Sequence, residues 1–193
     1  MSYSIKEISL DMTKNIYDEY INEYFPKGEV KPFSHIERMW NDGCYSALAL
    51  YDDENDKVAG FAFFANSKES RHILLDYLAV VKEYRCMGLG GIFLNGMREY
   101  VKGYEGILIE TEDVDMAENE EQLNERTRRN AFYKGNNAQQ TGIHACVYGV
   151  DYAIWNVPLD KETDVKKCCE SLQDIYKEIA PGKRYEEHVE ISY

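Results

Sequence analysis

Three closely spaced glycines are the feature of this sequence with the clearest chemical meaning. Gly88, Gly90 and Gly91 follow an apolar, β-leaning run over residues 73–81 and precede apolar residues that recur at helical spacing. A strand, a glycine turn and a helix in this order leave unpaired backbone N–H groups at the helix start, where the helix dipole also favours an anion. A plain tight turn is the alternative, but three such glycines cost helix stability that packing alone rarely requires. We therefore expect a phosphate-bearing ligand here.

The residues around these glycines narrow the choice of phosphate ligand. A P-loop needs Lys and then Ser or Thr after its second glycine, whereas Gly91 and Ile92 follow Gly90 in this chain. The dinucleotide fingerprint would begin at Gly88 and needs a third glycine where the chain has Phe93. Triphosphate hydrolysis and a nicotinamide cofactor therefore both fit poorly.

The composition is that of a compact, acidic protein. The chain has 44% hydrophobic residues and a formal net charge of −13, with acidic groups concentrated over residues 110–121. This charge repels nucleic acid phosphates, so no nucleic acid partner is expected. No apolar run approaches the roughly 20 residues of a membrane helix, and the N-terminal sequence lacks a signal-peptide pattern, which predicts a cytoplasmic protein without a membrane partner. Five cysteines without a C-x-x-C pair and four scattered histidines give no metal-ligand template, so no metal is expected.

Hydrophobic periodicity and turn residues predict strands and helices within a single domain. Strands are predicted over residues 3–10, 47–51, 58–65, 73–81 and 106–111, with a closing hairpin over 143–157. Helices are predicted over residues 11–24, 34–40, 92–101, 123–134 and 165–179. The strand, helix, strand order across residues 73–111 implies a right-handed crossover and a parallel strand pair, so the sheet is expected to be mixed.

The glycine turn and this order of elements together resemble the GNAT superfamily of acetyltransferases. The turn has the family's pattern R-x-x-G-x-G/A, present as Arg85-Cys86-Met87-Gly88-Leu89-Gly90, and the resemblance covers residues 3–159. It implies an α/β (α+β) fold with a mixed, mostly antiparallel central sheet flanked by helices. It also implies a GNAT-like domain over residues 1–160, with an extra C-terminal helix and tail over 161–193 packed on the same domain.

The resemblance implies acetyl coenzyme A as the acyl donor. The end of the central strand, Leu78-Ala79-Val80, would pair with the pantetheine arm in the way a neighbouring strand does. The pyrophosphate would meet backbone amides of the glycine turn. The implied donor-binding residues of that turn are Arg85, Cys86, Met87, Gly88, Leu89, Gly90 and Gly91.

The resemblance also implies direct transfer of the acetyl group to an amine, with a tyrosine as general acid to the leaving thiolate. Phe132 and Tyr133 match the end of the family's N-x-x-A-x-x-[FL]-Y motif, so Tyr133 is the candidate acid. Arg126 and Arg129 replace the Asn and Ala of that motif. An ordinary core tyrosine is the alternative interpretation of Tyr133, since the chain has 16 tyrosines.

The general base has three carboxylate candidates. Asp76 lies two residues before Leu78, at the place where histone-acetylating relatives carry a Glu base. Glu110 and Glu112 are its rivals, and strand alternation puts both on one face of the following strand. A solvated or salt-bridged carboxylate is the alternative for each of them, and deprotonation through water is a further one.

The acceptor is not specified by the sequence. In the family, acceptor selection comes from the loop between the first two helices and from the final hairpin, here residues 26–33 and 148–155. A small-molecule amine and a peptide amine are both open, and the net acidity favours a cationic acceptor. A second hypothesis is a non-catalytic acyl coenzyme A sensor or partner-binding module, in which the changes around Tyr133 remove the chemistry. The C-terminal helix would cover the sheet or join two subunits as a homodimer.

Overall fold

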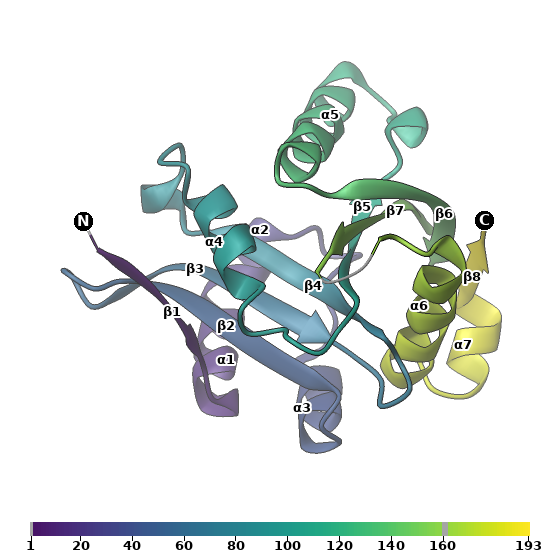
Figure 1. Cartoon of the computed structure of the whole chain (residues 1–193), viewed down its shortest axis with the longest axis horizontal. Helices are drawn as coiled ribbons and strands as arrows, with labels where there is room; N and C mark the ends of the chain where they lie inside the picture. The colour runs from purple at the N-terminus through teal and green to yellow at the C-terminus, as the bar shows by residue number, and fades with distance from the viewer. Residues whose placement is uncertain (1, 160–161) are drawn as a thin grey trace. The chain divides into compact units, whose positions relative to one another are not determined.

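The computed structural model describes residues 2–159 and 162–193, and its strands form one eight-stranded, mostly antiparallel sheet flanked by helices (Figure 1). The strands are β1 (Tyr3–Glu7), β2 (Tyr45–Asp52), β3 (Lys57–Ala65), β4 (His72–Val80), β5 (Gly106–Glu112), β6 (Gln139–Val147), β7 (Val150–Pro158) and β8 (Val189–Ser192). Their order is β1-β2-β3-β4-β5-β7-β6-β8, and β4 and β5 are a parallel pair. The mixed sheet predicted from the sequence is confirmed.

The helices occupy the connections between these strands and the C-terminal segment. They are α1 (Leu10–Ile16), α2 (Asn22–Tyr24), α3 (Phe33–Asn41), α4 (Leu89–Met97), α5 (Glu120–Gly135), α6 (Val165–Ile179) and α7 (Lys183–His188). A π-helical turn over Tyr17–Ile21 joins α1 to α2, and single 3₁₀ turns span Lys82–Tyr84 and Val114–Met116. In the described part of the chain, no helix combines the length and the apolar character needed to cross a membrane.

The chain forms two compact units. The first unit holds residues 2–65 and 76–100, and the second unit holds residues 66–75 and 101–193 apart from the two that are not described. The division crosses β4, whose residues 72–75 belong to the second unit and whose remainder belongs to the first. The boundary predicted between a domain over 1–160 and a C-terminal part over 161–193 falls outside the described residues.

An aromatic core fills one face of β3 in the first unit, where β1, β2 and β3 pair antiparallel. The Phe61 ring centroid lies 5.8 Å from that of Tyr20 and 6.4 Å from that of Tyr24. The preceding residue, Gly60, points the other way, and a Cβ there would lie 3.5 Å from the ring of Phe93 on α4. Since successive strand residues face opposite sides, α4 covers one face of β3 and the segment from α1 to α2 covers the other.

Strand pairing around β7 builds the second unit. β7 pairs antiparallel with β5 and β6, and β8 adds to β6. Residues 72–75 of β4 pair in parallel with β5, from His72 opposite Gly106 to Leu75 opposite Ile109. The helix predicted over residues 165–179 is confirmed as α6 with the same bounds. Its apolar side is buried in this unit and consists of Cys168, Cys169, Leu172, Ile175, Tyr176 and Ile179.

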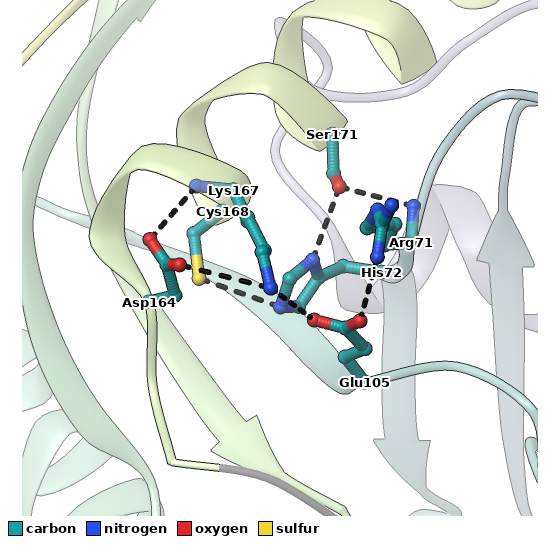
Figure 2. A network of polar contacts seen from close by, with 7 residues as sticks. All are labelled: Arg71, His72, Glu105, Asp164, Lys167, Cys168 and Ser171. Carbon is teal, nitrogen blue, oxygen red and sulfur yellow. Dashed lines mark hydrogen bonds and ion pairs between the residues drawn. The ribbon is translucent and has the colours of Figure 1, made fainter.

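A buried polar network fixes the first half of α6 (Figure 2). Ser171 Oγ accepts the backbone N–H of Arg71 at 3.1 Å and lies 3.0 Å from His72 Nδ1. His72 Nε2 lies 3.5 Å from Cys168 Sγ. Burial lowers the pKa of His72 and raises the pKa of Cys168 to about 12, so neither group carries its charge at pH 7. Cys168 is therefore a structural thiol and not a nucleophile.

Several element ends differ from the predictions. Helix α1 begins at Leu10 because Ser9 Oγ accepts the N–H of Met12, so the first strand ends earlier than predicted and the helix begins one residue before the predicted residue 11. Helix α4 ends at Met97, several residues before the predicted end at residue 101. α7 and β8 are absent from the predictions, since Pro181 and a short, charged tail hide their periodicity.

Candidate active site

The glycine turn has the geometry of an anion cradle. Cys86 has φ +63° and Gly88 has φ +75°, which turns the backbone sharply just before α4 begins at Leu89. Gly88 is the N-cap residue and has no side chain to satisfy the first amides of the helix. Within the described part of the chain, the amides of residues 86–91 donate no backbone hydrogen bond, whereas the N–H of Ile92 bonds to the Gly88 carbonyl. Unpaired amides at a helix start, next to left-handed residues, favour a bound phosphate.

Arg85 braces this turn against the end of β4. Its Nε donates to the Val80 carbonyl at 3.1 Å, and its guanidinium lies over the Tyr24 ring, 4.7 Å from the centroid. The Tyr24 hydroxyl in turn accepts the N–H of Lys82 at 3.0 Å. The structure therefore brings Arg85 and Val80, both predicted as donor-binding residues, into direct contact.

The last three residues of β4 lie beyond the stretch that pairs with β5. That pairing covers residues 72–75, and Leu78, Ala79 and Val80 are half-buried, unlike the buried first half of the strand. Gly60 lets the neighbouring backbone come close, since a Cβ there would lie 2.9 Å from the Ala79 carbonyl oxygen. The end of β4 is thus half-buried and lies past its pairing with β5, at the position expected for a strand-like ligand.

Asp76 lies in a buried ion pair in the first unit. Its side chain is only 1% exposed, and Oδ1 lies 2.6 Å from Lys31 Nζ while Oδ2 accepts the Tyr45 hydroxyl at 2.5 Å. Lys31 is itself held through its backbone, because its N–H donates to the Tyr77 hydroxyl and its carbonyl accepts the Tyr17 hydroxyl. Both carboxylate oxygens of Asp76 are therefore engaged, and a base role would require the Lys31 pair to open.

Glu112 is held by the two arginines that depart from the family motif. Arg126 Nη2 lies 3.0 Å from Oε1, and Arg129 Nη1 lies 3.0 Å from Oε2. Arg126 also donates from Nη1 to the Asp113 carbonyl at 2.5 Å. The arginines thus tie α5 to the end of β5, and an ordinary salt bridge, the alternative named for Glu112, describes this geometry.

Glu110 has a different partner, two residues earlier on the same strand. The hydroxyl of Tyr176 donates to Glu110 Oε1 at 2.5 Å. Tyr176 is 2% exposed and comes from α6, 66 residues further along the chain. The flanking residues Ile109 and Thr111 are buried, so Glu110 is a half-buried carboxylate between packed neighbours.

Tyr133 lies buried in the last turns of α5. Burial raises its pKa to about 12, and the nearby charge of Arg129 lowers it in part, so the phenol keeps its proton at neutral pH. The helix ends at Gly135, one residue past the predicted end: Asn136 is the C-cap and Asn137 takes the left-handed conformation at φ +68°. A protonated tyrosine at a fixed helix end meets the first requirement of a general acid.

The predicted site residues fall into two groups. The first unit holds Asp76 and the predicted donor-binding residues of β4 and the turn, and the second unit holds Glu110, Glu112 and Tyr133. Sequence reasoning missed Lys31 and Tyr45, which hold Asp76, and Tyr176, which bonds to Glu110. The unusual arginines of the α5 motif were a signal for the partners of Glu112, but nothing in the sequence pairs Tyr176 with Glu110. Among the described residues, no group of three or more His, Cys, Asp or Glu side chains could hold a metal ion.

Comparison with known proteins identifies the family. The model of the acetyltransferase (GNAT) family matches residues 11–124. The curated protein YjbC of Bacillus subtilis (strain 168), which its name places provisionally among the acetyltransferases, is 26% identical over 183 residues, 90% of this chain and 89% of that protein.

Two solved structures show the same fold at low identity. The spermidine N-acetyltransferase of Vibrio cholerae, in complex with CoA and spermine, is 12% identical with a TM-score of 0.58, over 82% of this chain and 96% of that chain. The ribosomal-protein-S18-alanine N-acetyltransferase of Escherichia coli is 18% identical with a TM-score of 0.55, over 84% and 97%. The family match includes the glycine turn and the strands on both sides of it. The chain therefore belongs to the acetyltransferase (GNAT) family, whose enzymes use acetyl coenzyme A.

Proposed function

We propose that this protein transfers an acetyl group from acetyl coenzyme A to a primary amine by direct attack of the amine on the thioester. The observation that carries the proposal is the turn over residues 86–91, which presents unpaired amides at the start of α4 within the region matched by the family. Two of the similar structures carry the names of enzymes that acetylate amines, spermidine in one and an alanine of ribosomal protein S18 in the other. The acceptor class is therefore an amine of a small molecule or of a peptide.

Backbone groups hold the donor in this proposal. The amides of residues 86–91 bind the pyrophosphate, and the backbone of the half-buried Leu78, Ala79 and Val80 pairs with the pantetheine arm. Arg85 holds the turn against the end of β4, because its Nε donates a hydrogen bond to the Val80 carbonyl. A Cβ at Gly88 would meet nothing within 4 Å, so the cradle is open on the side of that residue.

Tyr133 acts as the general acid. The carbon–sulfur bond of the thioester breaks as the carbon–nitrogen bond forms, and the departing sulfur takes the phenolic proton. The pKa of about 12 keeps that proton on Tyr133 until a thiolate develops beside it. No covalent acetyl-enzyme is required, which agrees with the buried and neutral state of Cys168.

A carboxylate takes the proton that the acceptor ammonium must lose. Asp76 pairs with the ammonium of Lys31 and Glu112 pairs with two guanidinium groups, so a base role for either carboxylate would require its ion pair to open. Glu110 is held by the phenol of Tyr176, which is a neutral donor. Asp76, Glu110 and Glu112 are the three predicted candidates for this base.

The proposal is tested by donor binding followed by turnover. Acetyl coenzyme A at about 100 times its Kd is expected to raise the free energy of unfolding by about 2.7 kcal/mol, which a thermal-shift measurement detects. Release of the coenzyme thiol is then measured with spermidine, an aminoglycoside, free lysine and a peptide with an N-terminal alanine. Absence of any shift at millimolar donor would contradict the proposal.

The non-catalytic sensor makes a different prediction in the same experiment. It predicts a thermal shift with acetyl coenzyme A but no thiol release with any amine of the panel. The clamping of Glu112 by Arg126 and Arg129 is the observation that favours this second function, since it ties a site carboxylate into a structural contact.

A further inference from the structure

The chain that enters the glycine turn is anchored at Tyr84 by a buried carboxylate 32 residues earlier. The 3₁₀ turn Lys82–Tyr84 ends directly before Arg85, and the Tyr84 hydroxyl donates to Oδ2 of Asp52 at 3.1 Å. Both residues belong to the first unit, together with the whole glycine turn. We propose that Tyr84 and Asp52 are positioning residues that hold residues 86–91 in the shape that binds the pyrophosphate of acetyl coenzyme A. The inference rests on the proposed function and deepens it.

Asp52 does more than close the hairpin between β2 and β3. It is the last residue of β2 and is only 2% exposed. Its Oδ1 accepts the backbone amides of Glu54 and Asn55 at 3.1 and 3.3 Å, as an Asp does when it closes a turn. Its Oδ2 accepts the side-chain amide of Asn55 at 2.7 Å and, in addition, the Tyr84 hydroxyl. The last of these bonds lies outside the hairpin and joins it to the entry of the glycine turn.

The bond between Tyr84 and Asp52 joins a neutral phenol to an ionised carboxylate. The hydrogen bond from Asn55 lowers the pKa of Asp52, and the bonds from Tyr84 and from the backbone act in the same direction against burial. Partial burial raises the pKa of Tyr84, and its bond to Asp52 raises that pKa further. A hydrogen bond to an ionised acceptor is about twice as strong as a neutral one. The bond therefore persists from about pH 5 to about pH 8.

Both ends of the glycine turn are attached to β3. Before the turn, the N–H of Val81 donates to the Ala59 carbonyl at 2.9 Å. After the turn, α4 lies against the same strand, since a Cβ on Gly60 would lie 3.5 Å from the ring of Phe93. Tyr84 adds a side-chain anchor to β2 directly ahead of the turn. The turn thus runs between a fixed helix and an entry whose position depends on Tyr84.

Loss of the Tyr84 bond would let this entry move while α4 stays in place. The amides of residues 86–91 converge on one anion only when the backbone keeps a single shape, so fewer molecules would be ready to bind. The measured Kd rises by the same factor by which the binding-competent population falls. A role in hairpin stability alone is the alternative, and it predicts a lower Tm without a change in donor affinity.

The test is the affinity for acetyl coenzyme A in Tyr84→Phe, which keeps the ring and removes only the hydroxyl. Titration calorimetry should show a Kd about tenfold higher, as for loss of a hydrogen bond to a charged group, with kcat at saturating donor nearly unchanged. With acetyl pantetheine as the donor, which lacks the pyrophosphate, kcat/KM should equal that of the wild type. In the Asp52→Asn background, Tyr84→Phe should raise the Kd by a smaller factor, because a neutral amide forms a weaker bond with the phenol.

Asn55→Ala is the matched control, because it removes the other bond to Oδ2 and leaves the Tyr84 hydroxyl in place. It should lower the Tm and leave the Kd for acetyl coenzyme A as it is. An unchanged Kd in Tyr84→Phe would overturn the inference, as would an equal rise in Asn55→Ala or an equal loss with acetyl pantetheine, while the proposed transfer would still stand. If the wild type binds acetyl coenzyme A but acetylates no amine of the panel, the proposed transfer fails and the Kd comparison still decides this inference. If the wild type does not bind the donor, both fail.

Discussion

The glycine turn of the first unit and the end of β5 in the second unit are two candidate functional regions, one made of backbone groups and the other of charged side chains. The turn over residues 86–91 presents backbone amides, and its shape follows from positive φ angles at Cys86 and Gly88. The end of β5 presents the carboxylates of Glu110 and Glu112, whose partners lie 14 to 66 residues further along the chain. A site made of backbone is therefore fixed by local sequence. A site made of charged side chains depends on which distant residues the fold brings beside them.

The largest expected effect concerns Tyr133, which lies in the second unit together with Glu110 and Glu112. Tyr133→Phe removes the proton that the departing thiolate needs, and kcat should fall about 10²–10⁴-fold. The Kd for acetyl coenzyme A should not change, because backbone amides of the turn supply the binding. Thiol release measures kcat, and titration calorimetry measures Kd.

Tyr193→Phe is the control for this change, since it removes a hydroxyl from an exposed tyrosine of the same unit. It should leave both quantities as they are. A loss of donor affinity in Tyr133→Phe as large as the loss in kcat would contradict the assignment of donor binding to the turn. Binding of acetyl coenzyme A would then depend on a side chain of the second unit as well.

The second prediction tests the one candidate carboxylate that lies in the same unit as the turn. Lys31→Met leaves the Asp76 carboxylate, 1% exposed, without its cation, and the free energy of unfolding should fall by about 3 kcal/mol. Methionine keeps an apolar stem against the Tyr77 ring, which the Lys31 ammonium faces at 5.4 Å from the centroid. Urea unfolding at pH 7 measures the loss.

The double variant Lys31→Met with Asp76→Asn separates charge from packing. Asparagine is neutral and retains an oxygen that can accept the Tyr45 hydroxyl, so most of the lost stability should return. A double variant as unstable as Lys31→Met alone would show that the lysine stem, and not the buried charge, is responsible.

Sequence reasoning succeeded where the signal is local. The strand, turn and helix around Gly88 are predictable because a left-handed N-cap position favours glycine whatever surrounds it. Helix α6 is predictable to the residue because Asp164 caps it, Pro181 follows it, and its apolar face is periodic. The end of α5 follows in the same way from Asn136 and Asn137.

Sequence reasoning could not find the partners of the carboxylates. Asp76, Glu110 and Glu112 look alike in a strand, and the difference between them lies in Lys31, the arginines of α5 and Tyr176. These pairings depend on the register of the sheet and on the side on which each helix packs. The same holds for the Ser9 cap of α1, where Ser9 and Asp11 are both good cap residues and the backbone geometry selects the first.

A smaller effect is expected at the turn, where only backbone geometry is altered. Gly88 has φ +75°, and a Cβ there would meet nothing within 4 Å, so Gly88→Ala introduces conformational strain of about 1–2 kcal/mol without a clash. The Kd for acetyl coenzyme A should rise about tenfold if the turn relaxes by that amount. Titration calorimetry is the measurement, and kcat at saturating donor should change little.

Gly135→Ala is the matched control for Gly88→Ala. Gly135 also has open space around a Cβ but lies in the last turn of α5 without a positive φ, so alanine should be tolerated there. Equal donor affinities for Gly88→Ala and the wild type would show that the cradle does not depend on the left-handed residue.

The smallest expected effect is a pH dependence of stability at the buried ring of His72, in the second unit. Burial lowers the pKa of His72 below its ordinary value, with Lys167 and Arg71 acting in the same direction and Glu105 and Asp164 opposing them. Ser171 and Cys168 are its uncharged contacts. As the pH falls through about 6.5, His72 therefore becomes protonated in the unfolded chain while it stays neutral in the folded chain. Stability should fall below that pH by at most about 1.4 kcal/mol per pH unit.

Urea unfolding between pH 7.5 and 5.5 measures this dependence in the wild type and in His72→Asn, whose slope with pH should be smaller. The control His144→Gln removes an exposed histidine of the same unit and should keep the wild-type slope. Donor affinity at the turn should be flat over the same range, because backbone amides do not titrate. A wild-type slope no steeper than that of His72→Asn would mean that the buried ring takes up its proton in the folded chain as readily as in the unfolded one, which would contradict this prediction.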